Sequence, residues 1–389
     1  MAAASLVPAP PIVEEVRIAV RELELANRSA TLDREPAFPR GEFRELGRRR
    51  LLGLRTQERF GGRGLPLADT AAALYHLAYG AGTTFAKLSL QPEFSGVLAE
   101  RGSPELVDRF FRPMVRGELL VANHLTEPGA GSDAGALSMR AQRDSQGYRL
   151  TGTKSQAAFA IDAEAAIVYA RTGPSNAGGR GITAFLVPQD STRIHRSTTG
   201  DLGERWMRRG TVEYDGVEVG EAQRIGAEGQ AFDYLRGELV RERLLLAAIY
   251  LGVGRSSFDA VVQHAGERET FGQPLASHEA VGFALVEDWA RLDATWLYVQ
   301  RALGRLEQGE GVEAESALAK WMATDVALQA IDHAVQFSGG RGYSRELPHE
   351  QRWRDVRSGG LAHGPSEIMH LIAARKLWPR RRDPESAGR

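Results

Sequence analysis

The sequence predicts an α+β protein with an N-terminal helical domain, a central small antiparallel β-domain and a C-terminal four-helix bundle. Residues 120–219 form short strand-like runs, whereas the segments on either side carry apolar residues at helical spacing. This order lacks the strand–helix alternation of a parallel sheet, and 389 residues suffice for two or three cores. We expect domains at residues 1–119, 120–228 and 229–378, and a flexible tail at 379–389.

The N-terminal region is predicted to be helical from Val13 to about Gly117. Ser103 and Pro104 are typical of an N-cap and of a first helical turn. They precede an apolar stripe at three positions of one helix face: Leu106, Phe110 and Met114.

The middle segment contains runs rich in β-branched and aromatic residues, separated by turns such as 144–147. The predicted strands are Tyr148–Thr151, Ala166–Ala170 and Ile182–Val187. After Glu228 the helical period returns and persists over long stretches. One such stripe consists of Leu285, Trp289, Leu292, Trp296 and Val299.

Composition excludes several classes of function. The 49 basic and 50 acidic side chains nearly cancel, so we expect neither nucleic acid nor a membrane as partner. The absence of cysteine excludes disulfides, thiolate nucleophiles and cysteine-ligated metals, and no metal site is predicted. No basic leader precedes the proline-interrupted start, and no apolar run of about 20 residues is expected to span a bilayer. We therefore expect a cytoplasmic protein.

The glycine-rich segment 125–133, LTEPGAGSD, is the first candidate binding motif. It loosely matches a dinucleotide-binding fingerprint, but that fingerprint requires a preceding strand and a following helix. Here Glu127 and Pro128 precede the glycines, in a region of predicted strands. The segment is better interpreted as a loop whose backbone N–H groups and hydroxyls approach a ligand closely.

Four segments together resemble the acyl-CoA dehydrogenase superfamily, over roughly Val13 to Leu377. Residues 125–133 are similar to the flavin-contacting signature of that family's β-domain. Residues 268–272, RETFG, resemble the family's Arg-x-Thr-Phe-Gly, whose arginine and phenylalanine reach the FAD of a neighbouring subunit. Residues 336–340 resemble the helix end that receives the adenine-pyrophosphate half, and Arg354-Asp355 stands at the family's Arg-Asp pair.

The resemblance implies FAD as cofactor and a homo-oligomer, either a dimer or a tetramer, because FAD then bridges two chains. A pyrophosphate requires N–H donors and a guanidinium, and the flavin ring requires a dry slot. The residues that the resemblance places on FAD are Leu125, Thr126, Gly131, Ser132, Gln156, Ala158, Arg268, Phe271, Gln336, Gly339, Gly340 and Glu367.

The catalytic base is where this sequence departs from the family pattern. Much of the family has a Tyr-Glu-Gly-Thr stretch near the C-terminus, but the matching stretch here places His363 at the glutamate position. Some members carry their base on the first long helix of the bundle, just before an arginine, and Glu242-Arg243 falls there. Glu242 or His363 is thus expected to take the α-proton of a thioester. The resemblance implies substrate contacts at Ser132, Arg243, Ala362 and His363.

A second departure keeps the reaction type open. Gln156 and Ala158 replace a tryptophan and a threonine that relatives carry near the flavin. The leading hypothesis is an FAD-dependent dehydrogenase acting on an acyl or aminoacyl thioester of coenzyme A or of an acyl carrier protein in specialised metabolism. An electron-transfer flavoprotein or O₂ would reoxidise the flavin. The alternatives are a flavin monooxygenase on the same fold and a catalytically silent partner subunit.

Overall fold

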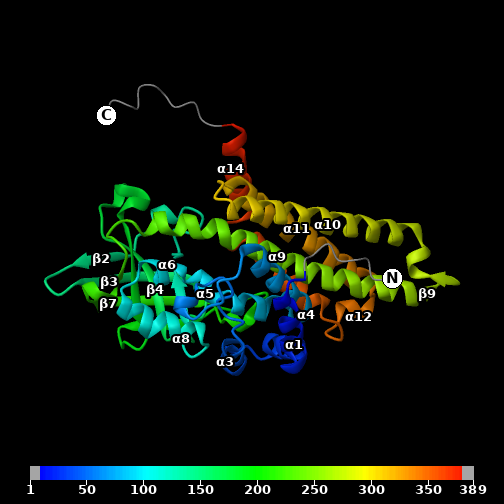
Figure 1. Ribbon diagram of the computed structural model, residues 1–389, viewed down its shortest axis with the longest axis horizontal. Coiled ribbons are helices and arrows are strands. Elements are labelled where there is room, and N and C mark those ends of the chain that lie inside the picture. The colour runs from blue at the N-terminus through cyan, green and yellow to red at the C-terminus, as the bar shows by residue number, and fades with distance from the viewer. Residues whose placement is uncertain (1–8, 379–389) are drawn as a thin grey trace.

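The computed structural model describes residues 9–378 and shows a β-domain at one end of a long helical body (Figure 1). The predicted tail at 379–389 lies outside the described residues. The helices of the N-terminal region are α1 (Pro11–Glu22), α2 (Leu25–Arg34), α3 (Arg40–Arg48), α4 (Leu67–Ser89), α5 (Gln91–Phe94), α6 (Gly96–Arg101), α7 (Pro104–Leu106) and α8 (Arg112–Val115).

Helix α4 forms the centre of the N-terminal region and is buried along nearly its whole length. It packs against α1 and α2 on one side and against the C-terminal bundle on the other. The predicted cap is confirmed, because the Ser103 side chain accepts a hydrogen bond from the Leu106 N–H (3.3 Å). A π-helical turn at Val107–Phe111 links α7 to α8.

The middle region folds into one twisted sheet, with strand order β6-β7-β3-β2-β4-β5-β8 and β1 beside β4. Most pairs are antiparallel, as predicted, but β1 and β2 both run parallel to β4. Every residue of β4 is buried, which explains its continuous apolar run. The strands are β1 (Val121–His124), β2 (Arg140–Arg143), β3 (Tyr148–Ala157), β4 (Ala165–Arg171), β5 (Ile182–Pro188), β6 (Ile194–Thr198), β7 (Gly210–Val219) and β8 (Arg224–Ile225).

The C-terminal bundle consists of α9 (Ala231–Glu267), α10 (Glu279–Glu307), α11 (Glu313–Phe337) and α14 (Ser366–Leu377), with the shorter α12 (Gly340–Tyr343) and α13 (His349–Arg357). A small hairpin, β9 (Glu269–Thr270) and β10 (Gln273–Pro274), joins α9 to α10 at the end of the molecule remote from the sheet (Figure 1).

Helix α9 corrects one expectation drawn from the sequence. By length and composition it could cross a membrane, although no such stretch was expected. Its most apolar window is 72% buried inside the fold, because α4 and α11 pack against it. An apolar composition on several sides is what a central core helix requires.

Buried polar contacts join the three regions into one body. Lys87 of α4 pairs with Glu204 of the β-domain, and the N–H of Glu204 donates to Asp355 of α13 (2.5 Å). Arg354 is engaged within the chain, where it forms a two-pronged pair with Asp33 (2.6 and 2.7 Å). The Arg354-Asp355 pair therefore fastens α13 to α2 and to the sheet domain.

Candidate active site

Glu242 is a buried carboxyl on α9, with 6% of the residue exposed. Burial raises its pKa well above the ordinary glutamate value, and the carboxyl of Glu238, one turn earlier, raises it further. The guanidinium groups of Arg241 and Arg243 oppose this shift without cancelling it. A carboxyl with a raised pKa is a suitable base for a carbon-bound proton.

His363 faces Glu242 from the turn that precedes α14. Its Nε2 atom lies 3.5 Å from a carboxyl oxygen of Glu242, and its ring stacks on Phe94 with centroids 5.0 Å apart. Burial and nearby lysine and arginine side chains lower the pKa of His363 to about 3, so the imidazole is neutral at physiological pH. The two residues that the sequence offered as alternatives thus lie together.

Buried basic side chains hold the turn that carries His363. Lys320 of α11 donates to the carbonyls of Ala362 (2.7 Å) and Gly364 (2.6 Å), and Arg243 of α9 donates to the carbonyl of His363 (3.3 Å). His363 has φ +54°, a left-handed conformation that is unfavourable for a side chain of this size. Hydrogen bonds from two helices therefore fix an otherwise strained turn.

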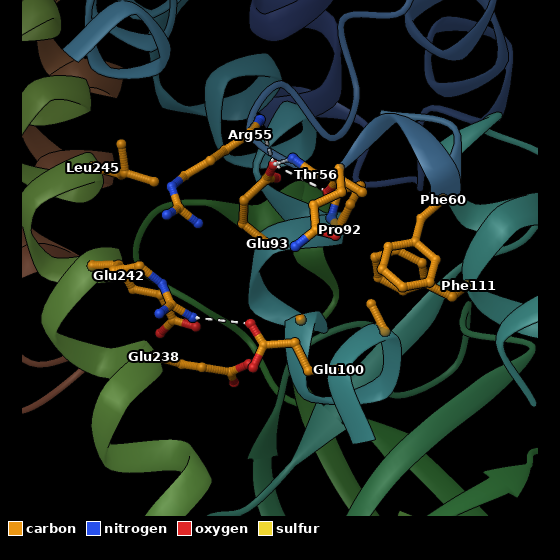
Figure 2. A pocket seen from close by; sticks show the side chains of 14 residues that line it. Arg55, Thr56, Phe60, Pro92, Glu93, Glu100, Phe111, Glu238, Glu242 and Leu245 are labelled. Atoms are coloured by element: carbon orange, nitrogen blue, oxygen red, sulfur yellow. Dashed lines mark hydrogen bonds and ion pairs between the residues drawn. The ribbon is translucent and has the colours of Figure 1, made fainter. Parts of the chain in front are cut away.

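A pocket that is open to solvent lies between α9 and the N-terminal helices and reaches Glu242 (Figure 2). Acidic groups lie along one part of its wall, while Phe60 and Phe111 lie together on another. The lining residues are Arg55, Thr56, Gln57, Phe60, Pro92, Glu93, Gly96, Ala99, Glu100, Phe111, Glu238, Arg241, Glu242 and Leu245.

The segment predicted to contact flavin is held at its start by β3. The Ser155 N–H donates to the Thr126 carbonyl (2.9 Å), and Lys154 donates to the Leu125 carbonyl (3.0 Å). Lys154 also pairs with the buried Glu127 (2.7 Å), whose carboxylate accepts further bonds from the loop that follows the glycines. Glu127 is thus a structural residue that shapes the loop.

Several predicted flavin residues lie close together at this edge of the β-domain. Gly131 is beside Thr126, because a Cβ built on the glycine would lie 4.0 Å from the threonine methyl. Ser132 is exposed in the same loop, and Gln156 and Ala158 follow the part of β3 that binds Thr126. Gln156 is exposed, and Ala158 is half-buried.

The other predicted FAD residues lie elsewhere in the single chain. Arg268 and Phe271 belong to the β9–β10 hairpin, at the end of the molecule opposite the sheet (Figure 1). Phe271 is 98% exposed. Gln336 is exposed at the end of α11, Gly339 and Gly340 are exposed where α12 begins, and Glu367 is exposed in the first turn of α14.

Four residues of the site were not predicted. Glu238 had a sequence signal, because it lies four positions before Glu242 and therefore on the same helix face. Lys320 also had a sequence signal, because it is a single basic residue within an apolar helical stripe. Phe94 and Glu93 had none, because only the tertiary packing of α5 brings them to the pocket and to His363.

Comparison with known proteins gives three family matches, which together cover most of the chain. The acyl-CoA dehydrogenase N-terminal domain matches residues 12–118, the middle domain 122–217 and the C-terminal domain 229–378. Benzylmalonyl-CoA dehydrogenase of Aromatoleum aromaticum is 32% identical over 361 residues, which cover 91% of this chain and 93% of that protein. The mitochondrial short-chain specific acyl-CoA dehydrogenase of Rattus norvegicus is 30% identical, covering 92% and 87%.

Solved structures agree with this assignment. A putative acyl-CoA dehydrogenase from Mycobacterium smegmatis superposes with a TM-score of 0.90 at 29% identity, covering 96% of this chain and 99% of that one. The FAD complex of PigA superposes with a TM-score of 0.88 at 26% identity, covering 94% and 96%. With its helical, β and helical domains and a buried carboxyl beside a pocket, the chain belongs to the acyl-CoA dehydrogenase family.

Proposed function

We propose that this protein is an FAD-dependent dehydrogenase of acyl thioesters in which Glu242 is the base that removes the α-proton. The observation that carries this proposal is the placement of Glu242, buried with a raised pKa, in the wall of an open pocket and next to a neutral imidazole. A surface ion pair, the ordinary role of a glutamate followed by arginine, would not be buried in this way.

The residues at the edge of the β-domain fit an FAD. A Cβ built on Gly129 would meet no described atom within 4 Å, and one on Gly131 would meet only Thr126, so the fold of the single chain needs neither glycine for packing. This bare backbone with neighbouring hydroxyls suits a cofactor that approaches closely. Thr126, Ser132 and Gln156 would hold the cofactor from one chain, and Arg268 and Phe271 from a second copy.

Bound FAD would supply the two-electron acceptor for the hydrogen that leaves the β-carbon with its electron pair. The chain itself handles the proton. The carboxylate of Glu242 takes the proton from the α-carbon, and a double bond forms between the two carbons. The neutral ring of His363, 3.5 Å away, limits where the carboxyl can turn, and Glu242 itself is only 6% exposed.

The thioester could be presented by coenzyme A or by an acyl carrier protein, and both remain within this proposal. Benzylmalonyl-CoA dehydrogenase is similar to this chain in sequence, and the prolyl acyl carrier protein oxidase AnaB is similar to it in fold. AnaB, at 24% identity, supports the fold alone. The acceptor that reoxidises the flavin is proposed to be an electron-transfer flavoprotein or O₂.

Anaerobic titration of the purified protein with a panel of acyl-CoA and acyl-carrier thioesters tests the proposal. A dehydrogenase is yellow as purified and loses its flavin absorbance when a substrate is added. A monooxygenase would instead consume O₂ only when reduced flavin is supplied, and a silent partner subunit would do neither. Persistence of the flavin absorbance with every thioester would contradict the proposed function.

A further inference from the structure

The pocket beside Glu242 has more carboxyl groups than guanidinium groups. Besides Glu242 it is lined by Glu93, Glu100 and Glu238, against Arg55 and Arg241. Arg241 approaches Glu100 only at 3.7 Å, and both side chains are partly exposed. Two guanidinium groups therefore face four carboxyl groups, and Arg241 offsets only part of the raised pKa of Glu238 and Glu242.

Glu238 is the group that points to a ligand. It is 4% exposed, and among the described residues no hydrogen-bond donor reaches its Oε1 atom. Figure 2 shows its side chain turned toward Glu100 at the pocket wall. The glycine at position 96 leaves room for this carboxyl, because a Cβ there would lie 2.9 Å from Oε1. A buried acceptor without a partner costs free energy that a donor on a ligand would recover.

Glu93 presents a second acceptor of the same kind. One of its oxygens accepts hydrogen bonds from the N–H groups of Arg55 (3.0 Å) and Thr56 (3.2 Å). Its other oxygen, Oε2, is buried and has no partner among the described residues. Burial raises the pKa of Glu93 to about 7 and that of Glu238 to about 8, so both protons are lost readily when a cation approaches.

The effect of a ligand's charge on the ionisation of Glu242 decides between a positive and a negative ligand. A positive charge beside Glu238 would favour the ionised form of Glu242, which is the form that accepts a proton. A carboxylate held by Arg55 and Arg241 would act in the opposite direction, because it would add a negative charge next to a carboxyl that already resists ionisation.

Spacing on α9 sets where the charge would lie. Glu238 and Glu242 are one helical turn apart, which separates their Cβ atoms by roughly 5–6 Å. If the α-carbon of a bound acyl group lies at Glu242, an atom about four bonds further along the acyl chain lies next to Glu238. This is the distance between the α-carbon and the nitrogen of a 5-aminovaleryl group.

We propose that this pocket binds an acyl group whose far end carries a positively charged amine, and that Glu238 is the residue that recognises it. The inference rests on the proposed function, because it takes Glu242 as the position of the α-carbon. It identifies the substrate class as aminoacyl thioesters with the amine remote from the thioester.

Calorimetric titration of the flavin-containing protein with three thioethers of pantetheine tests this inference without any turnover. The thioethers carry a 5-aminopentyl, a hexyl or a 5-carboxypentyl chain, and they cannot be dehydrogenated. We expect the amine to bind about tenfold more tightly than the hexyl compound, and the carboxylate to bind most weakly. In Glu238→Gln the preference for the amine should fall to less than about threefold. Glu105→Gln, at an exposed position outside the pocket, should retain it.

Three results would overturn the inference: tightest binding of the hexyl or carboxypentyl compound, an unchanged amine preference in Glu238→Gln, or no binding of any compound. If the variant fails to fold, the wild-type ranking still tests the preference of the pocket for a terminal amine. Turnover of the matching thioesters separates the two proposals. If the amine binds as expected but no thioester reduces the flavin, the proposed function fails and the binding inference stands.

Discussion

The wall around Glu242 and the hairpin that carries Arg268 differ in how completely a single chain forms them. Glu242 is 6% exposed, and its neighbours are fixed by hydrogen bonds from two long helices. Phe271 on the hairpin is 98% exposed, and a Cβ on Gly272 would meet no described atom within 4 Å. One chain therefore forms the surroundings of the proposed base by itself, whereas the exposed aromatic side chain is available for contacts outside the chain.

Replacing the proposed base is expected to have the largest effect. It tests the part of the comparison that concerns the surroundings of Glu242. Glu242→Gln removes the proton acceptor but keeps the size and polarity of the side chain. We expect anaerobic flavin reduction by a thioester substrate to slow about 1,000-fold, with FAD content unchanged. Stopped-flow absorbance provides the measurement, and Glu105→Gln is the matched control. Normal reduction in Glu242→Gln would assign the α-proton to another group.

Oligomers assembled from two different variants test the part of the comparison that concerns the exposed hairpin with Arg268. Arg268→Ala and Gly131→Trp should each lower FAD content strongly, because one removes a charged donor and the other fills the open glycine loop. Both positions are exposed, so thermal stability without FAD should change little.

If FAD bridges two copies, a hybrid dimer of the two variants, separated from the homodimers after co-expression, contains one intact site and one defective site. Bound flavin in the purified hybrid should then return to about half of the wild-type content, since each hybrid pair combines an intact hairpin with an intact loop. A hybrid that recovers no FAD would place both residues at the same site within one chain.

Lys320→Met is expected to have a smaller effect, mainly on stability. The variant leaves the carbonyls of Ala362 and Gly364 without their buried donor, which should lower the free energy of unfolding by about 1–3 kcal/mol. Urea denaturation measures this, and Lys376→Met, at a half-exposed ion pair, should cost less than about 1 kcal/mol.

The effect of Lys320→Met on stability is also expected to depend on pH. Burial lowers the pKa of Lys320 from 10.5 to about 7, so between these values the unfolded chain holds a proton that the folded chain lacks. Raising the pH then favours the folded state. The stability difference between wild type and Lys320→Met should therefore grow from pH 7 toward pH 10, and a difference that shrinks would contradict the assigned shift.

The smallest expected effect concerns the pH profile of turnover. The carboxyl of Glu238 raises the pKa of Glu242, so Glu238→Gln should move the acidic limb of the kcat profile to lower pH. A neutral acyl thioester is the appropriate substrate, because its binding does not depend on Glu238. A limb that stays in place would mean that the two carboxyl groups do not interact during turnover.

Much of the fold was predictable because local patterns and tertiary packing agree. The Ser103 cap, the buried run of β4 and the stripe of α10, except for the 44% exposed Trp289, all follow from local residue patterns. Helix α9 was predicted as a helix, but its apolar stretch was not, because a core helix that is apolar on several sides has the composition of a membrane span. The parallel pairing of β1 and β2 with β4 also depends on long-range contacts that no local run encodes.

The sequence by itself determined the family resemblance, the order of the three regions and the two candidate bases, because those depend on residue type and spacing along the chain. Only the tertiary structure decided that Glu242 and His363 meet, that Lys320 anchors their turn, and that Glu238 and Glu93 face one pocket. The physical reason is that burial and proximity between distant segments set the pKa values and the unpartnered oxygens, and neither property is contained in any single stretch of residues.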